Sequence, residues 1–119
     1  MQARTLGQLV DRNAAGRLIA FRDAALHAFP GAVQDVLLFG SRARGDAQPD
    51  SDYDVAVVLE YPLALDRNVR CQLADAAWEH VIDGYAIIPL ALSPDELPSD
   101  SGRGTELGAR IADEGISLR

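Results

Sequence analysis

The sequence predicts one domain of the α/β or α+β class, in which helices cover one side of a β-sheet. Its segments follow the order helix, strand, loop, strand, helix, strand, helix. A long helical segment joins the second and third strands, a connection that brings two strands into one sheet. A length of 119 residues, with 48% hydrophobic and 24% charged residues, is typical of a single globular domain spanning residues 1–119.

The first half of the chain changes from a helical to a strand pattern. Apolar residues at helical spacing predict the first helix, which Pro30 and Gly31 end. These residues are Leu18, Phe21, Ala25 and Phe29. Residues 32–40, AVQDVLLFG, predict a buried strand, and residues 53–60, YDVAVVLE, predict a second. The Gly, Pro, Asp and Ser residues between these strands predict a loop with at most a short helical turn.

The second half begins with a predicted amphipathic helix over residues 64–82, which Gly84 stops. Its apolar stripe consists of Leu65, Val69, Leu73, Ala76, Ala77 and Val81. Residues 85–92, YAIIPLAL, predict a third strand, in which Pro89 removes a backbone donor and so favours an edge position or a bulge. Residues 93–96, SPDE, have the capping-box pattern and predict a short helix. A last helix is expected over residues 106–113, before a polar end.

Charge and cysteine content exclude several classes of protein. The formal net charge of −7 argues against a broad face for duplex DNA or a membrane surface, because such binding relies on Lys and Arg. Cys71 is the only cysteine, so an intrachain disulfide and a cysteine-rich zinc site are excluded. The longest apolar stretch, residues 85–92, is too short to span a bilayer, and the first residues contain no apolar signal region. We therefore expect a cytoplasmic protein.

Two aspartates stand at the start of the second predicted strand. Side chains two apart on a strand share a face, so Asp52 and Asp54 project together while Tyr53 points away. Adjacent ionised carboxylates repel, and a cation such as Mg²⁺, which leaves room for substrate phosphates, relieves this repulsion. The alternative is that both are solvated loop residues. A calcium loop is excluded, because Val55 and Tyr61 replace its turn glycine and its twelfth-position Glu.

The residues that follow the first strand are suited to phosphate. Gly40 lets a ligand approach the backbone closely, and Ser41 opens a helical turn with free amide groups and a hydroxyl donor. The alternative role for Ser41 is that of a helix N-cap. Arg42 and Arg44 add guanidinium groups that match phosphate oxygens. Alternatively, these two arginines are surface residues that pair with acids of the loop, Asp46 or Asp50.

The combined pattern is that of a known family. Residues 40–45, GSRARG, followed after six residues by DYD at 52–54, resemble the signature of the DNA polymerase beta-like nucleotidyltransferase superfamily. The compact, arginine-bearing form resembles the minimal nucleotidyltransferase branch. The likeness is close over the core motif, residues 32–60, and loose as far as Leu92. It implies a mixed β-sheet covered by helices in a single nucleotidyltransferase domain.

The resemblance also implies an activity. Gly40 and Ser41 would hold a nucleoside triphosphate, and Asp52 and Asp54 would be the catalytic ligands of Mg²⁺. The reaction would move a nucleoside monophosphate, AMP when ATP is the substrate, to an acceptor hydroxyl. A partner or a homodimer interface would select the acceptor, since no second domain is present. The minimal branch is often paired with a small helical HEPN-type protein, sometimes as the antitoxin of a toxin-antitoxin pair.

The sequence departs from the family pattern at one point. The family usually supplies a third carboxylate from a neighbouring strand, but the third predicted strand contains no acid at Ala86 or nearby. Asp83, just before Gly84, is interpreted as a surface acid at the helix end, and the alternative is that Asp83, or an acid from a partner, completes the site as the third carboxylate. Two alternatives to catalysis therefore stay open: a catalytically degenerate module that binds nucleotide or a partner, and a plain interaction domain without a ligand.

Isolated residues of other reactive types give no signal of a site. His27 and His80 each lack a companion at ligand spacing and are expected to have surface or packing roles. Cys71 and Trp78, on the long predicted helix, are expected in the core or in an interface.

Overall fold

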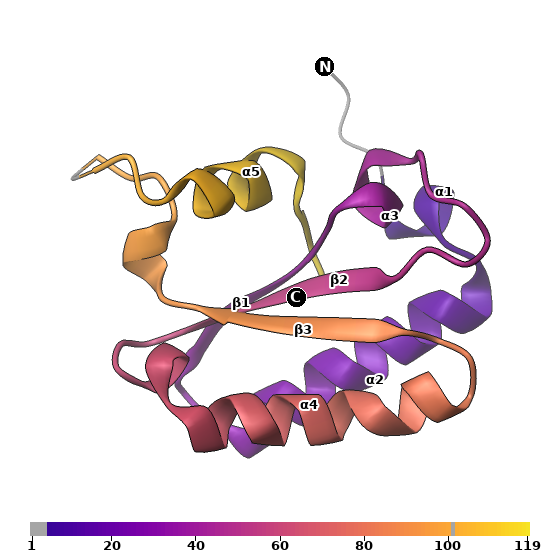
Figure 1. Cartoon of the computed structure of the whole chain (residues 1–119), viewed down its shortest axis with the longest axis horizontal. Helices are drawn as coiled ribbons and strands as arrows, with labels where there is room; N and C mark the ends of the chain where they lie inside the picture. Colours follow the sequence, from indigo (N-terminus) through magenta and orange to yellow (C-terminus); the bar gives the residue numbers. More distant parts are fainter. Residues whose placement is uncertain (1–4, 101) are drawn as a thin grey trace.

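The computed structural model describes residues 5–100 and 102–119, and within this part of the chain it contains one mixed β-sheet with helices on both faces (Figure 1). The sheet order is β3-β2-β1-β4. The elements are, in chain order, α1 (Leu6–Leu9), α2 (Arg12–Ala28), β1 (Val33–Phe39), α3 (Ser41–Arg44), β2 (Tyr53–Leu59), the 3-10 helix η1 (Leu63–Leu65), α4 (Arg67–Ile82), β3 (Ile87–Leu92), the 3-10 helix η2 (Pro94–Glu96), α5 (Glu106–Glu114) and β4 (Ile116–Ser117).

The connections of the sheet agree with the predicted order of elements. β1 and β2 are antiparallel, whereas β2 and β3 are parallel and are joined through α4. Pro89 lies on β3, which is an edge strand, so the expected edge position is confirmed. The capping box of Ser93 and Glu96 is also confirmed at the start of η2. The mixed α+β fold predicted from the sequence is the fold observed.

The main core lies between one face of the sheet and the helices α2 and α4. Every second residue of the central strands points to these helices and is buried, as a half-covered strand requires. The strand residues of this core are Val36, Leu38, Val55, Val57, Leu59 and Ile87, and those of the two helices include Leu18, Phe21, Ala25, Val69, Leu73 and Ala77. The predicted helical stripes therefore belong to the core, except for Leu65, which lies in η1 and is 61% exposed, and Val81, which is half-buried and lies outside the core cluster.

The opposite face of the sheet is also covered, which corrects the prediction of a sheet covered on one side. α5 packs there, and Figure 1 shows it across the sheet from α2 and α4. Ala56, Val58, Leu92 and Ile111 form a second buried cluster. The reason is visible in β2, where the residues facing away from α4 are apolar as well, so both of its faces must be removed from water.

The ends of several elements also differ from expectation. α4 begins at Arg67 rather than at residue 64, because the Asp66 side chain accepts hydrogen bonds from the amides of Asn68 (2.7 Å) and Val69 (3.3 Å) and so caps the helix. The short helix α1 was not expected. The polar end of the chain forms β4, which pairs with Leu37 and Leu38 of β1.

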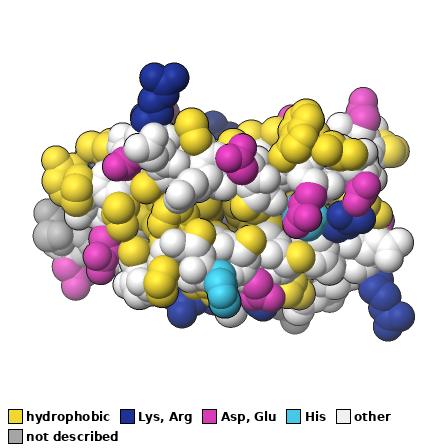
Figure 2. Space-filling view, turned by 90° about the horizontal axis from the view of Figure 1, so that it is seen from below, with side chains coloured by type: hydrophobic (Ala, Val, Ile, Leu, Met, Phe, Trp, Pro, Cys, Tyr) yellow, Lys and Arg dark blue, Asp and Glu magenta, His cyan; other side chains and the backbone are white. Residues whose placement is uncertain are grey.

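The outer face of α4 is exposed and partly apolar. Trp78 is 60% exposed, Ile82 is 66% exposed, and Cys71 is exposed too, so Trp78 and Cys71 do not lie in the core, and the expected alternative for both, an interface, stays a prediction. Figure 2 shows this side of the molecule, where hydrophobic side chains are interspersed with charged ones.

Within the described residues, no helix is both long enough and apolar enough to cross a bilayer.

Candidate active site

The site is built at the turn between β1 and α3. Gly40 adopts a φ of +77°, and a Cβ atom at this position would overlap the carboxylate of Asp54. Only glycine combines this backbone conformation with so close an approach. Gly40 is itself the N-cap residue of α3, which rules out the alternative N-cap role for Ser41. Ser41 is the first residue of the helix, and its hydroxyl makes no hydrogen bond to any described residue.

The two aspartates lie near each other, with Asp54 on the face of the sheet that α5 covers. Asp54 lies in β2 and is partly buried, Asp52 just precedes the strand and is exposed, and Tyr53 is buried on the other face, as predicted. Neither carboxylate forms a hydrogen bond or an ion pair within the described residues. Burial, followed by repulsion from Asp52, raises the pKa of Asp54 above its ordinary value. The two charges are therefore close enough to oppose each other.

A carboxylate pair of this kind fits a hard divalent cation. Mg²⁺ is usually held by one or two carboxylates together with water and substrate phosphates, and both aspartates have unengaged oxygens. Among the described residues, no group of three or more His, Cys, Asp or Glu is arranged to hold a metal ion. The remaining ligands would have to come from water and from a bound phosphate.

A cavity of about 290 Å³ joins the turn to Asp54. Its lining consists of Phe39, Gly40, Ser41, Arg44, Asp54, Leu107, Arg110 and Glu114. Four of the residues predicted from the sequence therefore meet at one cavity: Gly40, Ser41, Arg44 and Asp54. Asp52 is two residues from Asp54 in the sequence, but it does not line the cavity. Arg42 does not line the cavity either.

Arg42 has a different place from the one predicted. Its guanidinium donates to the carbonyl oxygens of Pro49 (3.2 Å) and Ser51 (2.9 Å) and lies 4.3 Å from the centre of the Tyr53 ring. It therefore fixes the loop that leads to the aspartates rather than facing the cavity. These contacts give Arg42 a positioning role in place of the suggested pairing with Asp46 or Asp50, and its contact with a nucleotide stays a prediction.

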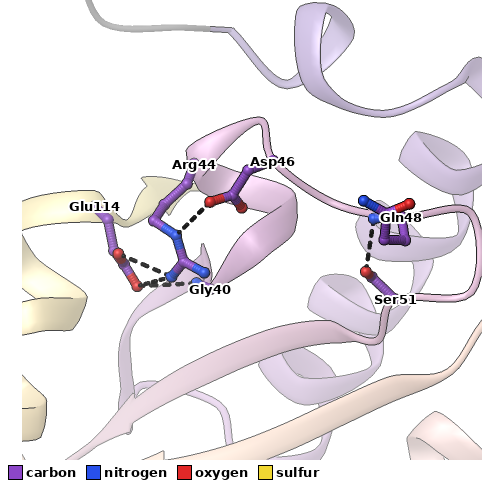
Figure 3. Close-up of polar contacts among 6 residues, drawn as sticks. All are labelled: Gly40, Arg44, Asp46, Gln48, Ser51 and Glu114. Carbon is purple, nitrogen blue, oxygen red and sulfur yellow. Dashed lines mark hydrogen bonds and ion pairs between the residues drawn. The ribbon is translucent and has the colours of Figure 1, made fainter.

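Arg44 lines the cavity and is held by two acids. Its Nε atom lies 3.2 Å from Asp46, the partner that the sequence suggested, and its Nη1 atom lies 3.3 Å from Oε2 of Glu114 (Figure 3). These bonds raise the pKa of Arg44 further above its ordinary value. Arg44 therefore combines the cavity position expected of a phosphate ligand with the ion pair expected of a surface residue.

Glu114 is the site residue that the sequence did not reveal. Its Oε1 atom accepts a hydrogen bond of 3.1 Å from the backbone amide of Gly40 (Figure 3). Ile116 of β4 pairs with Leu38 of β1. Because the strands are antiparallel, continuing this register by two residues places Glu114 opposite Gly40. No local pattern marks Glu114, because the pairing depends on a two-residue strand at the end of the chain. Arg110 was missed for the same reason, since α5 brings both residues to the cavity.

No third carboxylate comes from β3. The partner of Asp54 in the parallel register is Ile88, two residues further along than the expected position at Ala86. Ile88 is 46% exposed. The Asp83 carboxylate forms an ion pair of 2.7 Å with Arg17, at the end of α4, so Asp83 is the helix-end surface acid that the sequence suggested.

Several solved structures share this fold. A toxin-antitoxin crystallised with AMP-PNP is 23% identical, with a TM-score of 0.56, and covers 92% of this chain and 73% of its own. A candidate nucleotidyltransferase from Sulfolobus solfataricus is 16% identical, with a TM-score of 0.62, over 98% of this chain and 89% of its own. A mutant of the toxin-antitoxin MntA-HpeT, in which two aspartates two positions apart are replaced by glutamates, is 22% identical, with a TM-score of 0.54. The match covers 80% of this chain and 67% of the mutant's chain.

The sequence comparison identifies the family. No curated protein matches the chain. Residues 18–93 match the family described as the nucleotidyltransferase domain, a span that runs from α2 through the Gly-Ser turn and the two aspartates to the end of β3. This match covers well over half of the sequence, and the chain belongs to the nucleotidyltransferase domain family.

Proposed function

We propose that this protein is an Mg²⁺-dependent nucleotidyltransferase that moves a nucleoside monophosphate, AMP from ATP, to an acceptor hydroxyl. The observation that supports the proposal is the meeting of Gly40, Ser41 and Asp54 at one cavity, with Asp52 close enough to repel the Asp54 charge, in a member of the nucleotidyltransferase domain family. A backbone amide, a hydroxyl and paired carboxylates are the groups that recognise a metal-chelated triphosphate.

The residues have distinct roles in the proposed reaction. The Gly40 and Ser41 turn would bind phosphate oxygens, and Asp52 and Asp54 would hold a divalent cation, which when bound would supply charge neutralisation for the phosphates. The acceptor oxygen forms a bond to the α-phosphorus, the bond from this phosphorus to the bridging oxygen breaks, and pyrophosphate leaves. The hydroxyl proton is released to solvent. Arg42 positions the aspartates through the loop that it holds.

Label transfer tests this function. The protein is incubated with Mg²⁺, a host-cell lysate that supplies acceptors, and ATP labelled on the α-phosphate or, as a control, on the γ-phosphate. We expect transfer of the α-label alone, and its loss in Asp52→Ala and Asp54→Ala. Transfer of the γ-label would indicate a kinase. Transfer that persists in both variants would contradict the assignment of the two aspartates.

A protein partner is part of the proposal. Two of the structures with this fold are those of toxin-antitoxins, and one of them was crystallised with AMP-PNP. We infer a role as the nucleotide-binding member of such a pair in the cytoplasm, with a small helical HEPN-type protein as partner and source of the acceptor hydroxyl, or with a homodimer in its place. Co-purification with the product of an adjacent gene, followed by mass measurement of the modified partner, tests this role.

The second candidate function is a nucleotide-binding or partner-binding module without catalysis. Two observations favour it: β3 supplies no carboxylate beside Asp54, whose partner in the register is Ile88, and the Glu114 carboxylate accepts a hydrogen bond from the Gly40 amide. Calorimetry with Mg²⁺ and AMP-PNP separates the candidates when it is combined with label transfer. Binding without transfer supports the module. Absence of both supports an interaction domain that has no ligand.

A further inference from the structure

We propose that Glu114 is an intramolecular competitor for the phosphate position of this site, so that a nucleoside triphosphate binds only after it displaces the Glu114 carboxylate. The inference rests on the proposed function, because it concerns the same cavity. It adds that the described conformation is a self-inhibited one, in which a side chain of α5 takes the place of a substrate anion.

The contacts of Glu114 are those that a bound phosphate would need. Oε1 accepts from the Gly40 amide at 3.1 Å, and the Arg44 guanidinium reaches Oε1 at 3.4 Å and Oε2 at 3.3 Å. Figure 3 shows the carboxylate directed at both groups. The Glu114 side chain is only 16% exposed, although it lies at the end of a surface helix. A carboxylate held by a backbone amide and a guanidinium closely resembles a bound phosphate in its charge and hydrogen bonding.

The position of Glu114 is fixed by the fold rather than by chance contact of a flexible side chain. β4 pairs with β1 immediately after Glu114, and the amide of Leu118 donates to the carbonyl of Val36 at 2.7 Å. On its other side, Ile111 is fully buried in the second cluster. The backbone of Glu114 is therefore anchored at both ends, and its side chain can leave the Gly40 amide by rotation alone.

Charge and space both make the carboxylate and a triphosphate mutually exclusive. The Gly40 amide has a single hydrogen to donate, and a triphosphate beside Glu114 would meet a second anion at close range. Glu114 is one of the residues that line the cavity of about 290 Å³, so its side chain takes up space beside the Gly40 amide. Rotation of this side chain would free space, the amide and one hydrogen-bonding edge of Arg44 together.

Binding measurements on charge and length variants test the proposal. Calorimetry with Mg²⁺ and AMP-PNP is carried out on the wild-type chain, Glu114→Gln, Glu114→Asp and Asp113→Asn. Only the fraction of wild-type molecules in which Glu114 has left the Gly40 amide can bind nucleotide, and this fraction limits the measured affinity. Glu114→Gln is therefore expected to bind Mg²⁺ and AMP-PNP about tenfold more tightly than wild type. Glu114→Asp keeps the charge but is one methylene shorter. Because the backbone is anchored, the shorter side chain no longer reaches Gly40, so most of the gain in nucleotide affinity is expected in this variant too.

Asp113→Asn is the control for loss of one negative charge, and the outcomes that would overturn the competition can be told apart. Asp113→Asn removes the same charge from the neighbouring exposed position of α5 and should stay within about twofold of wild type. Equal affinity in all four proteins would overturn the competition while leaving nucleotide binding intact. A gain in Glu114→Gln without one in Glu114→Asp would assign the effect to charge alone and would also overturn it. Absence of binding in every protein would reject the proposed function and this inference together.

Discussion

Asp54 is the residue at which stability and chemistry conflict. Its carboxylate is partly buried, it accepts no hydrogen bond from a described residue, and Asp52 repels it. A carboxylate in such a place destabilises the fold unless a cation neutralises it. The arrangement is therefore explained by a ligand rather than by the folded state alone, which is the usual sign of a functional site.

The pKa of Asp54 leads to a test of this conflict. Because this pKa is raised in the folded state, the folded protein binds the Asp54 proton more tightly than the unfolded chain, so Asp54 lowers stability as the pH rises above about 4. Asp54→Asn should raise the Tm at pH 7 by about 2–4 °C, and the difference should vanish near pH 3. Thermal unfolding between pH 3 and 8, with Asp50→Asn as a control for loss of one loop charge, checks this. A lower Tm for Asp54→Asn at pH 7 would show that the carboxylate stabilises the fold.

His80 is a second buried group with an unmet requirement. Its ring is 3% exposed, Nδ1 lies 3.3 Å from the Arg17 guanidinium, and the proton is therefore assigned to Nε2, which has no hydrogen-bond partner among the described residues. The charged groups around it are Arg17, Glu79 and Asp83, and Glu79 lies 3.5 Å from Nε2. The sequence correctly assigned His80 a packing role, but it could not reveal the missing partner.

The pH dependence of stability should report on His80. Burial lowers its pKa, so the unfolded chain takes up a proton before the folded protein does, and stability falls as the pH drops below about 6.5. His80→Gln should remove this contribution, so its Tm should fall less than that of wild type between pH 7 and 5. His27→Gln, on an exposed position of α2, is the control. The same pH dependence in wild type and His80→Gln would exclude this role.

The site was predictable only as far as its residues are near one another in sequence. Gly40, Ser41 and the two aspartates lie within 15 residues on one strand-turn-strand unit, and Gly40, Ser41 and Asp54 line one cavity. Glu114 and Arg110 reach the same cavity through the pairing of β4 with β1, which is a long-range contact between short elements. Arg42 shows what a local pattern leaves out: its charge suggested a phosphate contact, but the sequence did not reveal that its guanidinium donates to carbonyl oxygens of the nearby loop.

At the scale of elements, type was easier to predict than position. The helices and strands with strong periodicity were found, because burial of an apolar stripe decides their formation. The start of α4 was not, because the apolar pattern continues through η1 while the capping side chain of Asp66 sets the first helical residue. α1 and β4 are too short to show any period, and tertiary contacts stabilise them.

The cap of α4 can be tested directly. Asp66 satisfies two amides at the first turn, at 2.7 and 3.3 Å, and truncation leaves both without this partner. Asp66→Ala should lower the free energy of unfolding by about 1 kcal/mol, equivalent to about 4–8 °C in Tm. Urea denaturation measures it, with Asp75→Ala, at an exposed position inside the same helix, as the matched control. A loss as large for Asp75→Ala would assign the effect to helix charge instead of to capping.

At the scale of the whole molecule, the sheet separates a large core from a small one. The larger core, under α2 and α4, holds most of the buried side chains, while α5 covers the opposite face through a cluster of four buried residues. The cavity lies on the side of the smaller cluster, and one of its walls is α5, whose only buried residues are Gly108 and Ile111. Local opening is expected to be easiest there, where few buried contacts hold the element in place. Coupling between α5 and the site is therefore a property of the architecture.

Truncation of Ile111 should separate this coupling from general destabilisation. Ile111→Ala and Leu73→Ala each remove a buried side chain, from the smaller and the larger core, and each should cost about 2–4 kcal/mol of unfolding free energy. Only Ile111→Ala loosens α5. In this variant alone, the Gly40 amide, which donates to Glu114, should exchange with solvent faster than the amides of the main core. Hydrogen exchange read by NMR compares these amides within each variant. Equal protection of the Gly40 amide in the two variants would mean that α5 does not open separately from the rest of the fold.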